Sequence, residues 1–161
     1  MVTCWVFSSK NRENIRRASE RLVWGFWDKD LMKSKKSEFA KKLAKNWRYF
    51  LRAYNRIETG DIVFFQIAGA GEIHAIGVVK DKYYDDQTSI WDVELEKRTV
   101  VFPWRVSFYI VIYSEEPFTR IFTELKNYVD GYGIGGISPH EARAILSEIE
   151  KKTHININIH I

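Results

Sequence analysis

The chain has 161 residues, 45% of them hydrophobic, and a net charge of +4, so it is long enough for one domain with a core of its own. No apolar run is long enough to span a membrane, no signal-peptide pattern opens the chain, and a single cysteine, Cys4, excludes an internal disulfide. We expect one cytoplasmic domain over residues 1–161, and the richness in Lys, Glu, Arg and Ile indicates a source that grows at high temperature.

The first half of the chain predicts a strand and two helices. Residues 2–7 are apolar and β-prone, and either Ser9 or Asn11 can cap a short helix over 14–22. A second helix begins at Ser37, because apolar side chains recur on one face while basic side chains lie opposite.

The second half predicts mainly short strands. Residues 62–67 and 74–79 are typical of a hairpin, and 99–113 of one or two strands. Residues 118–129 have a helical pattern, and 131–136 predict a glycine-rich loop. Short strands framed by helices in mixed order predict an α+β fold, with a small, curved, mostly antiparallel sheet or open barrel flanked by helices.

The C-terminal region predicts a helix and a final strand. Ser138 is a candidate N-cap, Pro139 suits the first helical position, and Glu141 completes a capping box. Over residues 155–161, isoleucine alternates with asparagine and histidine, which is typical of a strand with one apolar face. We expect the polar face to meet solvent rather than a metal ion.

Basic residues gather in one region of the chain. Residues 33–56 hold nine lysines and arginines against one acid, Glu38, while the rest of the chain is slightly acidic. Such a local excess predicts a surface for a polyanion, with Lys41, Lys45 and Arg48 as candidates for phosphate contacts. A solvated helix face that binds nothing is the alternative.

The motifs of common enzyme classes are missing from the sequence. It has no nucleophile elbow, no P-loop and no metalloprotease helix, and Cys4 lies in an apolar run. Asp81, Asp85 and Asp86 could hold a hard cation, but solvated acids of a turn are the simpler interpretation. We therefore expect no metal, no cofactor and no catalysis.

A polar strand end, a helix and a tryptophan form the strongest constellation. Ser8 and Ser9 end the first strand, Asn14 follows at the start of the helix, and Trp24 comes just after the helix. An asparagine amide can form two hydrogen bonds to a base edge, and a tryptophan face can stack on a base. The pattern alone nevertheless favours a helix-capping Asn14 and a core Trp24.

The same stretch resembles the YTH family, which belongs with the EVE and PUA-like domains. Residues 8–25 match without a gap the pattern S-x-x-x-E-N-hydrophobic, followed by V-W and a small residue. Further matches follow in family order along nearly the whole chain, at 62–65, 69–71, 75–78, Trp91 and 116–119, with EVE-type segments at 59–61 and 102–106.

The resemblance implies an aromatic cage for a modified base. Trp24 and Trp91 would be two walls that sandwich the base, and a third wall would come from Trp104, Trp27 or residues 97–100.

The resemblance also implies the hydrogen bonds to the base. The side chain of Asn14 would bond the Watson–Crick edge, and the carbonyl of Gly25 would accept from the methylamino N–H. The backbone near Ser8 and Ser9 would contact another ring nitrogen.

The implied function is a reader that flips N6-methyladenine of DNA or RNA into this cage and catalyses nothing. Where the family often has a basic loop for phosphate, this chain has glycines at 133–136, so phosphate contacts would fall to the basic region 33–56. Similar domains precede the AAA+ motor of McrBC-type restriction systems, which implies a AAA+ partner if the chain is an excised module. Another target such as methylcytosine, a PUA-like amidohydrolase and a purely structural barrel remain open.

Overall fold

The computed structural model describes residues 2–28, 38–121, 123 and 132–154, and for 38–45 it describes the backbone alone. The elements in chain order are β1 (Cys4–Ser9), α1 (Arg12–Arg21), β2 (Val23–Phe26), α3 (Glu38–Arg56), β3 (Ile62–Ile67), β4 (Glu72–Tyr84), α4 (Asp92–Lys97), β5 (Trp104–Tyr113), β6 (Thr119–Arg120), β7 (Ile134–Ile137) and α5 (Pro139–Thr153).

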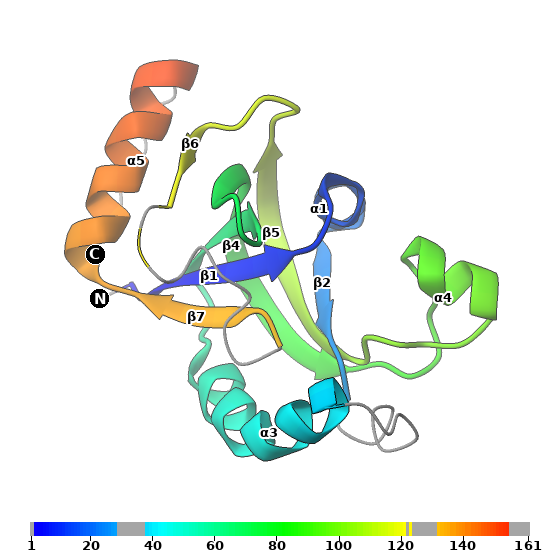
Figure 1. The fold of residues 1–161 in the computed structure, drawn as a ribbon. Helices are drawn as coiled ribbons and strands as arrows, with labels where there is room; N and C mark the ends of the chain where they lie inside the picture. The colour runs from blue at the N-terminus through cyan, green and yellow to red at the C-terminus, as the bar shows by residue number, and fades with distance from the viewer. Residues whose placement is uncertain (1, 29–37, 122, 124–131, 155–161) are drawn as a thin grey trace.

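One curled sheet organises these elements (Figure 1). Its strand order is β2-β5-β4-β3-β1-β7, and β6 pairs with the start of β4. Each pair of neighbours is antiparallel except β1 and β3, which run parallel. The prediction of an α+β fold with a curved, mostly antiparallel sheet flanked by helices is confirmed.

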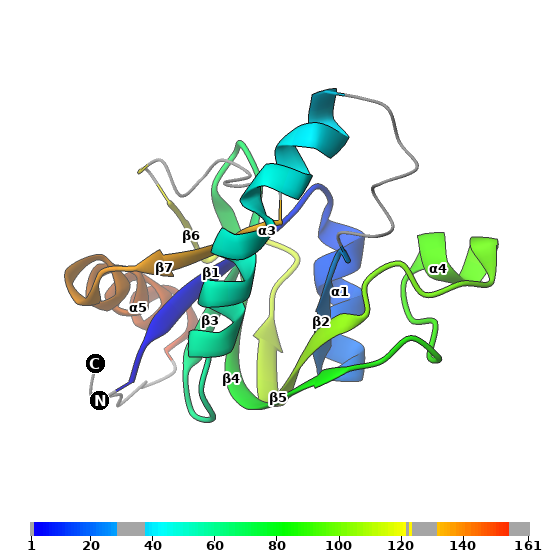
Figure 2. The ribbon, with the colours of Figure 1, turned by 90° about the horizontal axis from the view of Figure 1, so that it is seen from below.

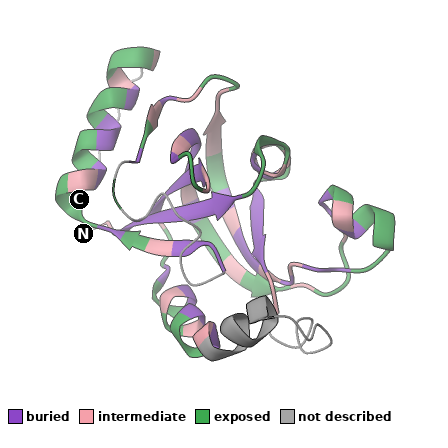
Figure 3. Cartoon of the chain, in the orientation of Figure 1, coloured by how far each residue is buried: buried purple, intermediate pink, exposed green. Residues whose placement is uncertain are grey.

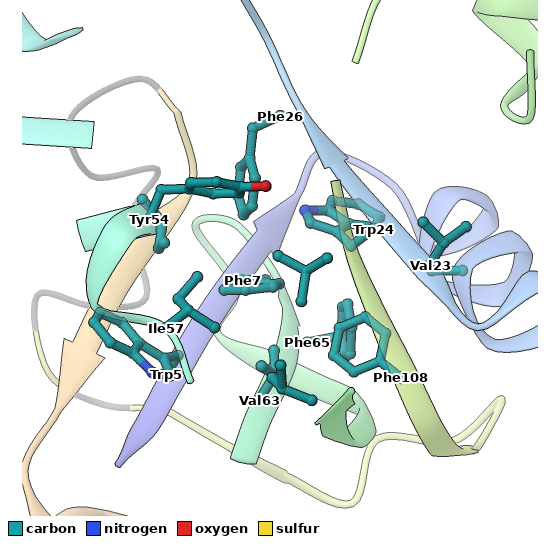
Figure 4. Close-up of a cluster of buried hydrophobic side chains, with 14 of the residues drawn as sticks. Trp5, Phe7, Val23, Trp24, Phe26, Tyr54, Ile57, Val63, Phe65 and Phe108 are labelled. Atoms are coloured by element: carbon teal, nitrogen blue, oxygen red, sulfur yellow. The ribbon is translucent and has the colours of Figure 1, made fainter. Parts of the chain in front are cut away.

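Strand β1 lies between β3 and β7, and both of its faces are buried, which explains its uninterrupted apolar run. Trp5 and Phe7 point into a first core that includes side chains of α1 and α3, and Figure 4 shows the aromatic rings that meet there. Cys4 and Val6 point to the opposite face, into a second core that α5 covers. Figure 3 shows the buried positions along the central strands and on the sheet-facing sides of the helices.

The helices differ in how closely they cover the sheet. Seen from below, α3 crosses one face, whereas α4 projects away from the body beside β2 (Figure 2). Within the described ranges, no helix has the length and apolar character needed to cross a bilayer.

The predicted start of the last helix is confirmed. The Oγ atom of Ser138 accepts a hydrogen bond from the backbone N–H of Glu141 at 3.2 Å, and Pro139 is the first helical residue. The Glu141 carboxylate accepts instead from the Thr123 hydroxyl at 3.1 Å, so it ties the helix start to the segment after β6.

Two predictions for the segment before this helix are wrong. Residues Thr119–Arg120 form β6 where the sequence predicts a helix, although residues 122 and 124–129 of that predicted helix lie outside the described part. Residues Ile134–Ile137 form β7, paired with β1, where the sequence predicts a glycine-rich loop. Pairing with strands far away in the chain decides both segments, and local propensity does not reveal it.

Smaller differences concern the bounds of elements. Helix α1 begins at Arg12, with Asn11 as its N-cap, rather than at residue 14. Strand β4 is longer than the predicted hairpin strand, and the short helix α4 after Trp91 is unforeseen. The strand predicted over 155–161 lies outside the described residues.

The cysteine is a core side chain. Cys4 is 2% exposed, and burial, together with the nearby Asp61 carboxylate, raises the pKa of its thiol to about 11. Because the thiolate is the reactive form, Cys4 stays unreactive at neutral pH.

Candidate functional site

A cavity of about 130 Å³ lies where β1 ends and α1 begins. Cavities of roughly 150 Å³ in protein interiors admit a benzene-sized ring, so this one suits a small flat aromatic group. The residues that line it come from four separate segments of the chain: Ser8, Ser9, Lys10, Asn11 and Asn14; Trp24, Gly25 and Trp27; Trp91 and Phe102; and Tyr132.

The turn between β1 and α1 is fixed by side-chain hydrogen bonds. The Asn11 side chain accepts from the Asn14 N–H at 2.9 Å and caps α1. The Ser9 hydroxyl donates to the Asn11 carbonyl at 2.8 Å and accepts from the Asn11 N–H at 3.2 Å. Asn11, one of the two caps that the sequence predicts, is therefore the N-cap, and Asn14 does not cap the helix. The Asn14 amide makes no hydrogen bond to any described residue, although its backbone carbonyl accepts from Trp91.

Ser8 lines the cavity, but its hydrogen bonds run to other parts of the fold. Its N–H donates to the Gly133 carbonyl at 2.8 Å, so this one N–H is not available to a ligand, and the backbone contact near Ser8 and Ser9 stays a prediction. Its hydroxyl oxygen accepts from the buried amide of Gln66 at 2.7 Å. Ser8 and Gln66 are paired across β1 and β3 on the face of Cys4 and Val6, so the Ser8 hydroxyl points away from the core that holds Trp24 and Trp91.

Trp24 and Trp91 both line the cavity, but they are not the parallel walls that the resemblance implies. Their ring centroids are 5.8 Å apart and their planes meet at 80°, so the edge of one ring rests on the face of the other. A base held between parallel rings needs about 7 Å between the planes, twice a 3.5 Å contact. The two indoles as arranged leave no room for a base between them.

Gly25 directly follows Trp24 in the chain, and the space beside its Cα atom cannot hold a side chain. A Cβ atom there would lie 2.6 Å from the Phe102 carbonyl oxygen, 2.7 Å from the Phe102 Cβ and 3.1 Å from the Trp91 ring. The absence of a side chain thus lets β2 approach the segment after α4 and brings the Gly25 backbone to the cavity.

Of the candidates for a third wall, Trp27 lines the cavity, whereas Trp104 and residues 97–100 do not. Trp27 lines the cavity and packs against Phe102 at 4.7 Å between centroids. Trp104 lies elsewhere, because its ring packs against Trp47 at 5.6 Å and Tyr84 at 5.3 Å. Residues 97–100 are likewise absent from the lining.

Two further aromatic residues of the lining, Phe102 and Tyr132, are not foreseen from the sequence. Phe102 precedes Pro103, and an aromatic side chain beside a residue that interrupts a strand is a signal by which it could be found. Tyr132 has no such signal, because the strand that follows it is not apparent in the sequence.

The charge around the cavity is positive. Lys10 is the charged residue of the lining, which includes no carboxylate in the part of the chain that the structure describes. Arg48 of α3 is exposed, while the side chains of Lys41 and Lys45 lie outside the described residues.

Asp85, in the acidic loop after β4, bonds to other residues of the protein. Burial raises the pKa of Asp85, but N–H groups of Gln87 and Thr88 and the guanidinium of Arg105 outweigh it and hold the pKa below its usual value. Among the described residues, no three His, Cys, Asp or Glu side chains are grouped to hold a metal ion.

The chain is similar to known proteins in sequence and in fold. No family model matches it. It is 46% identical over 152 residues to protein MJ1369 of Methanocaldococcus jannaschii. This alignment covers 94% of this chain and 93% of that protein. The crystal structure of the Pho92 YTH domain in complex with m6A aligns with a TM-score of 0.50 and 14% identity, over 92% of this chain and 84% of that one. The Toxoplasma CPSF4-YTH domain in apo form aligns with a TM-score of 0.47 and 10% identity, over 93% and 87%.

Proposed function

Because the chain belongs to the family of protein MJ1369 of Methanocaldococcus jannaschii and has a YTH-like fold, we propose that it reads a modified base in nucleic acid. The base flips out of the strand and enters the cavity at the junction of β1 and α1. The observation that carries this proposal is the lining, which combines aromatic rings with an Asn14 amide that no described residue bonds.

N6-methyladenine is the base that suits this lining best. Its methylamino group has one N–H and one methyl, so it needs one acceptor and one apolar wall. The Gly25 carbonyl is the proposed acceptor, and the Asn14 side chain and the backbone near Ser8 and Ser9 are the proposed partners of the ring nitrogens. The Pho92 YTH domain, which shares the fold, was solved with m6A. An unmethylated base leaves a methyl-sized gap worth about 1 kcal/mol, or roughly fivefold in affinity.

The edge-to-face indoles set a condition for this binding. A base that lies between Trp24 and Trp91 requires one indole to rotate away from the other. A base that stacks beside them uses the faces of Trp27, Phe102 or Tyr132 without such a rotation.

The direct test compares matched oligonucleotides. Fluorescence anisotropy with single-stranded RNA and DNA, each carrying adenine, N6-methyladenine, cytosine or methylcytosine at one position, measures the preference and the type of nucleic acid. Tighter binding of the N6-methyladenine strand supports the proposal, and equal affinity for all strands overturns it. We propose binding without turnover, so mass spectrometry after long incubation should find the modified base unchanged.

Asn14→Ala should weaken binding of methylated and unmethylated strands alike, by about 1–3 kcal/mol, because both present the same ring edge. The thermal midpoint should stay the same, since the amide bonds to no described residue. The control is Ser147→Ala, an exposed polar residue of α5, which should change neither quantity. A loss of affinity for the methylated strand alone would contradict the role of Asn14.

The basic region is proposed to supply affinity that does not depend on the base. Replacing Lys41, Lys45 and Arg48 with alanine should weaken both strands equally and reduce the slope of log affinity against log salt by about two units, since each single-strand phosphate contact contributes roughly 0.7. A variant with the same loss of charge on α5, at Arg143, Lys151 and Lys152, is the control and should bind as the wild type does. If both variants keep the wild-type slope, α3 is only a solvated face.

A further inference from the structure

Glu94 is a fully buried carboxylate on a short helix that is otherwise largely exposed. One carboxylate oxygen accepts from the N–H groups of Ile90 at 2.9 Å and Trp91 at 3.4 Å. The other oxygen accepts from the N–H groups of Val101 at 2.8 Å and Phe102 at 3.0 Å. A single side chain therefore joins the backbone before α4 to the backbone after it.

Arg105 of β5 neutralises this carboxylate and adds bonds of its own. It has no exposed side-chain surface, and its guanidinium lies 3.4 Å from Glu94 and 3.0 Å from Asp85. It also donates to the carbonyls of Phe102, at 3.1 Å, and Thr88. Buried charges need such complete pairing, because an unpaired one is expensive to remove from water.

The two residues held by this ion pair are walls of the cavity. Trp91 and Phe102 both line it, and their rings pack edge to face at 5.5 Å. The guanidinium carbon of Arg105 lies 5.6 Å from the centre of the Trp91 ring, within the range of a cation–π contact. Neither Glu94 nor Arg105 belongs to the lining.

We propose that Glu94 and Arg105 are positioning residues, which set the place of Trp91 and Phe102 and thereby the preference for a methylated base. This inference rests on the proposed function of the cavity. The segment that bears α4 projects from the body (Figures 1 and 2), and a cavity wall stands at each of its ends. A change in the ion pair therefore moves both walls together.

If the ion pair of Glu94 and Arg105 only stabilised the fold, its loss would not change the preference for a methylated base. Another buried carboxylate, Asp61, serves as the comparison. Asp61 accepts from the Trp5 indole N–H at 2.9 Å and from the backbone N–H groups of Thr3 at 3.2 Å and Glu58 at 2.9 Å. It is 4% exposed, and none of these partners lines the cavity. Asp61→Asn thus disturbs a similar set of bonds at a distance from the site.

The experiment measures the affinity ratio of methylated to unmethylated strands for Glu94→Gln and Asp61→Asn, at a temperature at which circular dichroism shows both folded. Glu94→Gln should lower the ratio towards one, a loss of about fivefold, whereas Asp61→Asn should leave it unchanged. Equal ratios in the two variants, or an unchanged ratio in Glu94→Gln, overturn the proposal. If Glu94→Gln does not fold, Glu94→Asp keeps the charge beside Arg105 but is one methylene too short to hold both segments, and the same outcomes apply.

A second readout separates this inference from the proposed function. In protein labelled with ¹⁵N-tryptophan, Glu94→Gln should shift the indole N–H resonance of Trp91, and Asp61→Asn that of Trp5. If the wild type shows no preference for a methylated strand, the proposed function fails, and the resonances still report whether the ion pair places Trp91. An unmoved Trp91 resonance in Glu94→Gln overturns the positioning role by itself.

Discussion

Trp24→Ala should abolish the preference for a methylated strand and lower the free energy of unfolding by about 3–5 kcal/mol. The indole is 6% exposed and packs edge to face on Phe65 at 5.7 Å and on Trp91 at 5.8 Å. Its removal opens a cavity in the core and takes away a ring that borders the site. Chemical denaturation measures the first effect, and anisotropy with the paired strands measures the second.

The control for this prediction is Trp5→Ala. Trp5 is 3% exposed in the same core but lines no part of the cavity, so its loss should cost a similar amount of stability and leave the affinity ratio intact. A ratio that falls equally in both variants would mean that general loosening, and not the wall, causes the effect. Trp24→Phe keeps a flat ring and serves where the alanine variant is too unstable to assay.

Arg105→Met should lower the free energy of unfolding by about 3–5 kcal/mol, because it leaves the buried Glu94 carboxylate without a cation. The methionine fills part of the space but replaces none of the guanidinium bonds to Asp85, Thr88 and Phe102. Urea denaturation of the variant and the wild type measures the difference.

A double variant tests the cause of this loss. Adding Glu94→Gln to Arg105→Met removes the uncompensated charge, so the double variant should be more stable than Arg105→Met alone. Full replacement of the pair by apolar residues should not succeed, because Glu94 also satisfies four backbone N–H groups. If Arg105→Met costs less than about 1 kcal/mol, as exposed pairs do, the ion pair contributes little to the fold.

The parts of the fold that follow from local pattern are those that the sequence predicts well. The apolar run of β1, the hairpin of β3 and β4, and the cap of α5 at Ser138 depend on neighbours in the chain. Strand β7 does not, because Gly135 and Gly136 are extended only through pairing with β1. The wrong prediction there follows from judging glycines by local propensity.

The candidate site divides in the same way. The motif that contains Ser8, Asn14, Trp24 and Gly25 is contiguous enough to be found in the sequence, and the structure places all four around one cavity. The angle between the indoles and the displacement of Trp104 depend on packing, which no spacing encodes.

The sequence does not identify the buried ion pair of Glu94 and Arg105, for another reason. Glu94 stands among Asp92, Glu96 and Lys97 on what the sequence presents as a polar segment. Nothing in that run distinguishes the one carboxylate that turns inward. Only the positions of its four backbone donors and of Arg105 identify it.

The order of the strands has a consequence for how the protein is made. Among the described strands of the sheet, β1 is synthesised before the others, its parallel partner β3 follows after α1, β2 and α3, and its other neighbour β7 is synthesised last. Sheets that depend on such distant pairings form slowly and expose apolar strands meanwhile. The residues that line the cavity extend in the sequence from Ser8 to Tyr132. The cavity therefore cannot be complete until Tyr132, which precedes β7, has been synthesised. A chain whose synthesis stops before β7 contains most of the aromatic residues of the site but cannot assemble them into a complete cavity.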